Sequence, residues 1–157
     1  MAASTRPRLR VYRGADAPFV EELARRAFAE YSRRAAVAGA RAAPHAGVVT
    51  LVAVVGEAPA GFATVAVHAG GRQVIASLDA IAVEPEHRGR GVGKVLLAGA
   101  ERKAKAAGAT ELRLVTAEAN LAALDLFLRS GFEINARLGR YYERGQNAVR
   151  MRKTLAP

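Results

Sequence analysis

Apolar and polar residues in the first part of the chain follow two different periods, and each period predicts its own kind of element. A period of two predicts a strand over about 8–13. A polar break follows, and Asp16 can cap a helix that has Pro18 in its first turn. Apolar residues at helical spacing then predict an amphipathic helix over 17–31, and an Ala- and Arg-rich stretch predicts a short second helix over 32–43.

Three apolar stretches in the middle of the chain predict consecutive strands over 48–55, 61–69 and 74–83. The segments between them, 56–59 and 70–72, contain glycine, and the first also contains proline, which is typical of turns. Tight connections join strands that run in opposite directions. The sequence therefore predicts an antiparallel meander here.

The second half of the chain alternates helix and strand. Gly108 and Gly131 stand where glycine commonly ends a helix. The predicted elements are a helix over 91–107, a strand over 111–116, a helix with the apolar stripe Leu121, Leu124, Phe127 and Leu128, a strand that begins at Phe132, and a last strand over 148–155. A strand, a helix and a strand at this spacing form a parallel pair. We therefore expect an α/β fold with a mixed sheet of six or seven strands and about four helices.

The length and composition suit one domain over residues 1–157, with a disordered terminus over 1–7. About half of the residues are apolar, which is enough to bury a core. No run approaches the roughly 18–20 apolar residues of a membrane span, and the basic start lacks the apolar segment of a secretory signal. With no cysteine, disulfides, thiolate metal sites and a cysteine nucleophile are excluded. These features favour a cytoplasmic protein without a membrane partner.

The formal net charge of +10 makes nucleic acid a partner to consider. The arginines are scattered along the whole chain, however, and no stretch interleaves aromatic with basic residues as a stacking platform would. We expect no specific nucleic-acid partner. Attraction of an anionic cofactor is a simpler use of the charge.

The stretch Arg88-Gly89-Arg90-Gly91-Val92-Gly93 connects a predicted strand to a predicted helix. Glycine allows positive φ and lets a ligand approach the backbone closely. Amides of such a loop and of the first helical turn converge on one spot, where the helix dipole adds positive potential. With the charges of Arg88, Arg90 and Lys94 around it, this loop is suited to a phosphate or pyrophosphate.

Two common phosphate-binding motifs do not fit this loop. The P-loop pattern fails at its first glycine and at its Ser/Thr, and the dinucleotide fingerprint fails at its third glycine. The pattern that fits is Gln/Arg-x-x-Gly-x-Gly/Ala, on Arg88, Gly91 and Gly93.

Further residues around this pattern occur in a fixed order. They are Ile81-Ala82-Val83 before Pro85, then the loop, then Asn120, then Ser130-Gly131-Phe132. This segment, from Leu78 to Phe132, resembles the acetyl-CoA-binding region of the GNAT superfamily of N-acetyltransferases. The predicted elements outside it agree in order and type with the GNAT fold.

The resemblance implies an acetyl-CoA-dependent N-acyltransferase that acetylates a primary amine of a small molecule, an amino acid, a peptide or a protein. Holding both reactants together supplies much of such a rate, so we expect direct attack in a ternary complex. By the resemblance, main-chain groups of Ile81–Val83 hold the pantetheine arm, the loop holds the pyrophosphate and Asn120 contacts the cofactor; as an alternative, Asn120 is only a helix N-cap. The residues assigned to acetyl-CoA in this way are Ile81, Ala82, Val83, Arg88, Gly89, Arg90, Gly91, Val92, Gly93, Lys94, Asn120 and Phe127.

Phe127 departs from the family pattern. Many relatives have a tyrosine there that protonates the leaving thiolate, and phenylalanine cannot donate a proton. Tyr141 and Tyr142 are the substitutes that the sequence offers, since in peptide-acetylating relatives a tyrosine pair in this hairpin contacts the acceptor. One of the two could instead simply pack on the sheet.

Asp79 is the best candidate for the base that takes a proton from the amine. Its position resembles that of an acidic residue that polarises the amine in many relatives, and period-two geometry places it on the strand face of Ile81 and Val83. As an alternative, Asp79 is a structural carboxylate. Glu118 and His68 are weaker candidates. His45, His68 and His87 lack metal-ligand spacing, and we expect no metal.

The tyrosine pair and the final strand resemble the ribosomal-protein N-terminal acetyltransferase branch most. That branch has an acidic residue where this chain has Val115, and a tyrosine where it has Phe127. A non-catalytic acyl-CoA-binding or sensor module is therefore an alternative hypothesis, and a basic nucleic-acid-binding domain is a third. The family also allows a homodimer, for which the sequence indicates no interface.

Overall fold

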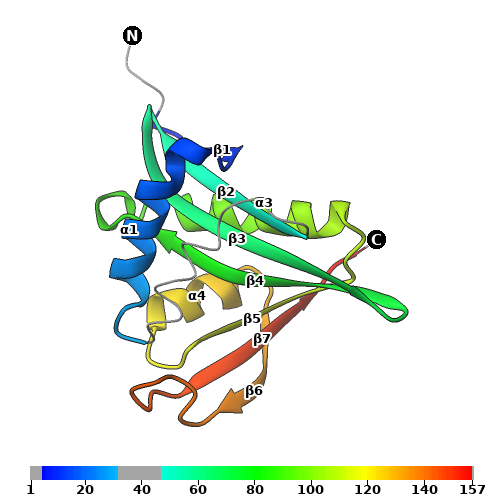
Figure 1. Cartoon of the computed structure of the whole chain (residues 1–157). Coiled ribbons are helices and arrows are strands. Elements are labelled where there is room, and N and C mark those ends of the chain that lie inside the picture. The colour runs from blue at the N-terminus through cyan, green and yellow to red at the C-terminus, as the bar shows by residue number, and fades with distance from the viewer. Residues whose placement is uncertain (1–4, 32–46, 157) are drawn as a thin grey trace.

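The computed structural model describes residues 5–31 and 47–156, and its centre is one seven-stranded sheet in the order β1-β2-β3-β4-β5-β7-β6 (Figure 1). The strands are β1 (Arg8–Val11), β2 (Val48–Val55), β3 (Ala58–Gly70), β4 (Gln73–Val83), β5 (Glu111–Ala117), β6 (Glu133–Leu138) and β7 (Ala148–Thr154). The α-helices in the described part are α1 (Ala17–Phe28), α3 (Val92–Ala106) and α4 (Leu121–Arg129), and short 3₁₀ turns cover Gly14–Asp16 and Pro85–His87.

The predicted arrangement of strands is confirmed. β2, β3 and β4 form an antiparallel meander, and β4 pairs with β5 in parallel across the α3 connection. α3 ends where predicted, because Gly108 adopts φ +84° and the amide of Ala109 bonds the carbonyl of Ala104 at 3.0 Å. The helix predicted over 32–43 lies outside the described residues.

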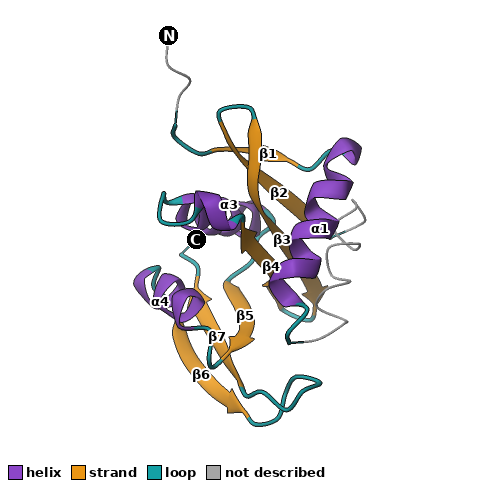
Figure 2. Ribbon diagram, turned by 90° about the vertical axis from the view of Figure 1, so that its left-hand side faces the viewer, coloured by secondary structure: helices purple, strands orange, loops and turns teal. Residues whose placement is uncertain are grey.

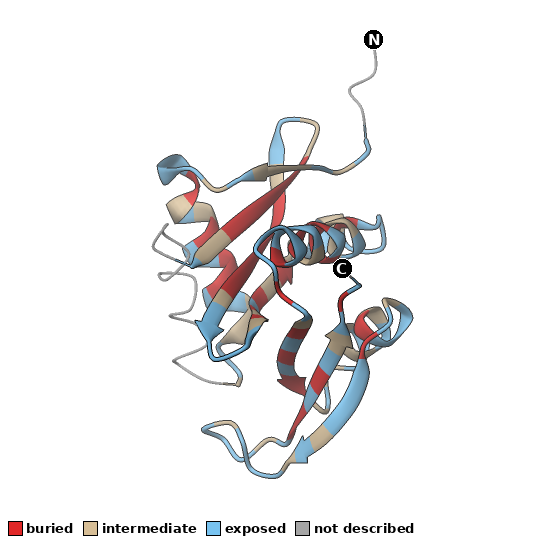
Figure 3. Ribbon diagram, turned by 90° about the vertical axis from the view of Figure 1, so that its right-hand side faces the viewer, coloured by how far each residue is buried: buried red, intermediate tan, exposed pale blue. Residues whose placement is uncertain are grey.

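Helices cover both faces of the sheet: α1 lies on one face, and α3 and α4 lie on the other (Figure 2). The larger apolar core lies between the sheet and α3, and a smaller one packs Val20 and Leu23 of α1 against Phe62, Ala80 and Ala82. Buried residues concentrate on the central strands, whereas β6 at the sheet edge is mostly exposed (Figure 3). No helix of the described chain is long and apolar enough to cross a membrane.

The start of α1 differs from the prediction. Asp16 occupies the N-cap position, but its side chain does not cap α1. Its carboxylate instead accepts two hydrogen bonds from the Arg10 guanidinium, at 2.7 and 2.8 Å, and one from the Arg13 amide at 2.7 Å. The ion pair with Arg10 ties β1 to the start of the helix and holds the pKa of Asp16 below its ordinary value, chiefly through the hydrogen bond from Arg10.

β4 and β5 stay together over a short distance only. Ile75, Ala76 and Ser77 pair with Glu111, Leu112 and Arg113, and no further register pair joins the two strands. Beyond that point they diverge, while β4 keeps its pairing with β3 up to Val83 and β5 keeps its pairing with β7. The divergence leaves the β5-facing edge of β4 open in the middle of the sheet.

Candidate functional site

The loop before α3 presents main-chain amides. Gly91 is the N-cap residue of α3, and no side chain caps this helix, so amides of its first turn lack partners within the helix. Gly89 and Gly91 adopt φ +74° and +78°, and a Cβ on either would meet no atom within 4 Å. Glycine is therefore required by the backbone conformation and not by crowding. The result is an open anion-binding surface at a helix N-terminus.

A cavity of about 690 Å³, here named the loop cavity, opens beside this helix start. Eleven of the twelve residues assigned to acetyl-CoA by the resemblance line it; Arg90 is exposed and lies outside the lining. Arg88 and Lys94 bring positive charge to the wall, whereas Arg129 is already paired with Asp125 at 3.0 Å. The loop cavity therefore fits a ligand with phosphate groups.

The open edge of β4 continues this cavity. Ile81, Ala82 and Val83 line it, and they belong to the part of β4 that has no partner on β5. The side chains of Ile81 and Val83 pack against the larger core, and that of Ala82 belongs to the smaller one. Main-chain groups are therefore what this edge offers, and they can pair with an extended, amide-containing ligand as an added strand would.

The structure is compatible with both roles that the sequence suggested for Asn120, a helix N-cap and a contact to the cofactor. Its Oδ1 accepts a hydrogen bond from the Ala123 amide at 3.2 Å and so caps α4. Since the oxygen is engaged, the amide nitrogen Nδ2 is the group left to contact a ligand. Asn120 lines the loop cavity and also a second cavity, which is described below.

Phe127 forms part of the apolar wall of the loop cavity. It is 2% exposed and packs edge-to-face on Phe132, with ring centroids 5.8 Å apart. Here, where many relatives have an acidic hydroxyl, this chain has a hydrocarbon ring. The Phe127 ring has no group that could donate a proton.

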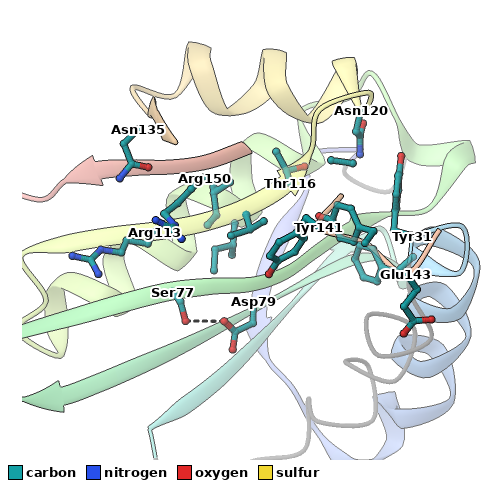
Figure 4. Close-up of a pocket in the computed structure, with 16 residues that line it drawn as sticks. Tyr31, Ser77, Asp79, Arg113, Thr116, Asn120, Asn135, Tyr141, Glu143 and Arg150 are labelled. Atoms are coloured by element: carbon teal, nitrogen blue, oxygen red, sulfur yellow. Dashed lines mark hydrogen bonds between the residues drawn. The ribbon is translucent and has the colours of Figure 1, made fainter. Parts of the chain in front are cut away.

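The second cavity, here named the splay cavity, has a volume of about 1230 Å³ and lies where β4 and β5 diverge (Figure 4). The connection between β6 and β7 closes one side of it by crossing to the end of α1. There Gln146 Nε2 donates to the carbonyl of Glu30 at 2.7 Å, and the Tyr142 ring lies 5.3 Å from that of Tyr31. The two cavities share Phe28 and Asn120, so a molecule in one can meet a molecule in the other.

Asp79 lines the splay cavity, but not on the strand face that the sequence predicted. Thr64 pairs with Ala80 and Val65 pairs with Leu78, so Asp79 is the extra residue of a β-bulge. The bulge changes the alternation: Ile81 and Val83 face the core beneath α3, whereas Asp79 shares a face with Ser77. The prediction that Asp79 shares the face of Ile81 and Val83 is therefore wrong.

A chain of hydrogen bonds connects Asp79 to His68. Ser77 Oγ donates to Asp79 Oδ1 at 2.7 Å, and His68 Nε2 lies 3.1 Å from the same Oγ. The hydroxyl has one hydrogen, which Asp79 receives, so His68 Nε2 must be the donor to Ser77. His68, a weaker candidate for the base, is thus linked to the stronger one.

Tyr141 and Tyr142 both line the splay cavity, with their rings 4.9 Å apart and nearly perpendicular. Tyr141 is 52% exposed, whereas Tyr142 is half-buried. Burial raises the pKa of Tyr142 to about 12, with a smaller contribution from Tyr141. Tyr31 completes the cluster, and burial, followed by its contact with Glu30, also raises its pKa to about 12.

Tyr31 was not singled out from the sequence. As the last residue of a predicted helix it carried no distinguishing signal, and only its contact with Tyr142 places it in the wall.

The remaining candidates have other surroundings. Glu118 forms an ion pair with Arg137 and lines neither cavity. His87 lines the loop cavity, where its Nδ1 is buried without a hydrogen-bond partner in the described structure. His45 lies outside the described residues, and among those described no group of His, Cys, Asp or Glu could hold a metal ion.

Solved structures share this fold over nearly the whole chain. Arabidopsis thaliana NAA60 in complex with acetyl-CoA superposes with a TM-score of 0.83 at 16% identity, over 95% of this chain and 98% of that one. The ribosomal-protein-S18-alanine N-acetyltransferase from Escherichia coli gives 0.78 at 21%, over 96% and 95%, and Ard1 from Thermoplasma volcanium gives 0.79 at 24%, over 96% and 99%. At these identities the likeness shows a common fold.

The sequence itself carries the family signal. No curated protein matches the chain significantly. The sequence model of the Acetyltransferase (GNAT) family, in contrast, matches residues 10–132, which is well over half of the chain and includes both the loop cavity and Asp79. The chain therefore belongs to the GNAT family of acetyltransferases.

Proposed function

We propose that the chain is an N-acetyltransferase that moves the acetyl group of acetyl-CoA directly onto a primary amine while both are bound. The observation that carries this proposal is the pair of cavities that meet at Phe28 and Asn120. One is built for a phosphate-bearing ligand, and the other is lined by a carboxylate and by tyrosine hydroxyls. Two substrates held at one junction lose little further entropy on reacting.

The loop cavity takes the cosubstrate in this proposal. Amides at the start of α3, with Arg88 and Lys94, would hold its phosphates, and the open edge of β4 over Ile81–Val83 would hold its pantetheine arm. When bound, acetyl-CoA supplies an acetyl thioester, an activated acyl group. Asn120 Nδ2 is placed to donate a hydrogen bond at the junction.

The splay cavity takes the amine. An amine attacks only when it is neutral, and Asp79 is the carboxylate on this cavity's β4 wall that can take its proton. Ser77 donates a hydrogen bond to Asp79 and accepts one from the exposed His68, so these two residues hold the carboxylate in place. His68 and Ser77 support Asp79 and do not contact the amine in this scheme.

The leaving sulfur needs a proton, which Phe127 cannot supply. We assign this step to Tyr141. Burial raises the pKa of Tyr142 to about 12, so this residue suits hydrogen-bond donation more than proton release. This division of roles rests on the exposure of Tyr141 and the burial of Tyr142 within one perpendicular pair.

Phe127 is also the observation that favours a second candidate function, a module that binds acetyl-CoA without transferring the acetyl group. The two candidates share the loop cavity and differ in turnover. The family match supports transfer, and binding alone does not separate them.

The test is calorimetric titration of acetyl-CoA followed by a free-thiol assay with a panel of amines and peptides. Arg88→Ala/Gly91→Ala should lose at least tenfold in affinity, because it removes one charge and strains a left-handed position. Gly56→Ala is the matched control: Gly56 also has positive φ in open space, but it lies in the β2–β3 turn away from both cavities.

Binding that survives the double substitution would contradict the loop assignment. Binding in wild type without thiol release on any acceptor would favour the second candidate function. No binding in wild type would overturn the proposal altogether.

A further inference from the structure

The charges of the splay cavity suggest what its amine acceptor carries besides the amine. Four charged side chains line the cavity, namely Asp79, Arg113, Glu143 and Arg150. Arg113 forms an ion pair with Glu111, with Nε 3.0 Å from Oε1. Glu143 also has an interaction within the chain. Asp79 and Arg150 have no ion-pair partner among the described residues. One cavity thus presents one uncompensated charge of each sign.

The sheet register explains why Arg150 is left without a partner. Its cross-strand neighbours are Val115 on β5 and Ala136 on β6, and neither carries a charge. Two residues along the same strand and face, Arg152 is opposite Glu133 and bonds it, with Nε 3.1 Å from Oε1. The two arginines share one strand face, but Arg152 is neutralised by Glu133, whereas Arg150 lines the cavity without an ion pair among the described residues.

The two uncompensated charges stand on different walls. Asp79 belongs to β4, Arg150 to β7, and β5 lies between these strands in the sheet. Figure 4 shows Ser77 and Asp79 along the β4 side, and Arg113 and Arg150 together on the side of β5 and β7. Val115, which is 36% exposed, lies on β5 beside Arg150 and offers an apolar surface in the same cavity.

We propose, building on the function proposed above, that the acceptor is a primary amine whose molecule also carries a carboxylate. Asp79 receives the amine, Arg150 binds the carboxylate, and Val115 contacts the carbon chain between them. A guanidinium presents a planar fork of donors that matches a carboxylate in two hydrogen bonds. Amines with a second positive charge are disfavoured, because that charge would meet Arg150 with no carboxylate to offset it.

Two sources supply this chemistry, a free amino acid and a peptide with an acidic side chain near its N-terminus. Acceptor pairs that differ only in carboxylate against carboxamide test each source: 4-aminobutyrate against its amide, and Ala-Glu-amide against Ala-Gln-amide. We expect about a tenfold advantage in kcat/KM for the acid of at least one pair, mainly through KM, since a charge-assisted hydrogen bond in a partly exposed site has that size. The pair that shows the advantage identifies the source.

Variants assign the effect to Arg150. Arg150→Gln should reduce the advantage of the acid to about onefold, and Arg150→Lys should restore part of it, because the charge returns without the fork. Arg152→Gln is the matched control: the same substitution is made on the same strand face, but at an ion-paired arginine outside the cavity lining. It should leave the advantage unchanged.

Equal kcat/KM for acid and amide in both pairs, or an advantage that survives Arg150→Gln, would overturn this inference while leaving the acetyltransferase proposal standing. Equilibrium titration of the same pairs into the CoA-loaded protein gives a second readout that needs no turnover, and equal affinities there would also overturn it. Failure of acetyl-CoA to bind, in contrast, is the result that overturns the proposed function.

Discussion

The loop cavity and the splay cavity meet at two residues, yet they are built from different parts of the polypeptide. The loop cavity relies on main chain: two left-handed glycines, an uncapped helix start and an unpaired strand edge. The splay cavity relies on side chains that come from α1, β4, β5, β6, β7 and the connection between β6 and β7. A site made of main-chain groups binds a common chemical group whatever its side chains are. The ligand preference of a site made of side chains, in contrast, can change through single substitutions.

Replacing the Asp79 carboxylate should separate the functions of the two cavities most clearly. Asp79→Asn is expected to lower kcat/KM by about 10²–10³-fold, because the amine loses its proton acceptor. The dissociation constant of acetyl-CoA should stay within twofold of wild type, since Asp79 lines only the splay cavity. Steady-state kinetics and calorimetry measure the two quantities.

Glu118→Gln serves as the control, since Glu118 is ion-paired with Arg137 outside both cavities, and it should leave kcat/KM nearly unchanged. A comparable loss in both variants would show that Asp79 is not the base.

The tyrosine pair gives the next largest effect. Tyr141→Phe should lower kcat by about 10²-fold if it delivers the proton to the leaving sulfur, and Tyr142→Phe should lower it less. Burial raises the pKa of Tyr142 to about 12, so the phenol stays protonated up to that pH. Titration of Tyr142 therefore causes no loss of activity between pH 7 and pH 10.

A pH–rate profile of each variant measures this. If Tyr142→Phe removes an alkaline decline below pH 10, the assignment of roles within the pair is reversed.

Single substitutions around the loop cavity test whether it depends on main chain. Gly91→Ala should weaken acetyl-CoA binding by about tenfold, because a Cβ at φ +78° costs roughly 1–2 kcal/mol. Ile81→Val, which changes a side chain that packs into the core, should alter the affinity by less than twofold. Calorimetry measures the acetyl-CoA affinity of both variants. A larger loss of affinity for Ile81→Val than for Gly91→Ala would mean that side chains dominate binding in this cavity too.

The smallest effect belongs to a region outside both cavities. Asp16→Asn should lower the free energy of unfolding by about 1–2 kcal/mol at neutral pH, through loss of the ion pair with Arg10. The pKa of Asp16 is lower in the folded than in the unfolded state, so its contribution is complete above the unfolded value and is lost as pH falls through the folded one. Urea unfolding between neutral and acidic pH measures it.

Neither acetyl-CoA affinity nor acceptor KM should change in Asp16→Asn. A change in either would show that the start of α1 is coupled to the cavities.

Much of the fold was predictable because its signals are local. The three meander strands, the parallel β4–β5 pair and the ends of α3 follow from apolar periodicity and from glycines at turns and helix ends. The prediction that the Asp16 side chain caps α1 was wrong, and the reason is physical. Arg10 competes for the same carboxylate from a neighbouring strand, and that contact leaves no trace in the local pattern.

The position of Asp79 shows the same limit inside the site. Counting by twos along β4 assumed an uninterrupted strand. The bulge at Asp79 leaves Ser77 and Asp79 on one face but turns Ile81 and Val83 to the other. The link to His68 also depends on tertiary structure, because its hydrogen bond joins residues that the pairing of β3 with β4 brings close.

The sequence by itself determined the loop cavity, since a left-handed glycine and a helix start depend on a few consecutive residues, and backbone conformation is a local property. Tertiary structure decided the splay cavity. It exists because β4 and β5 part after three register pairs, and because Gln146 reaches the carbonyl of Glu30, 116 residues earlier in the chain. Whether Arg150 is neutralised or free is likewise settled by which residues lie opposite it in the sheet. Such pairings come from the packing of distant segments, and no periodicity along the chain encodes them.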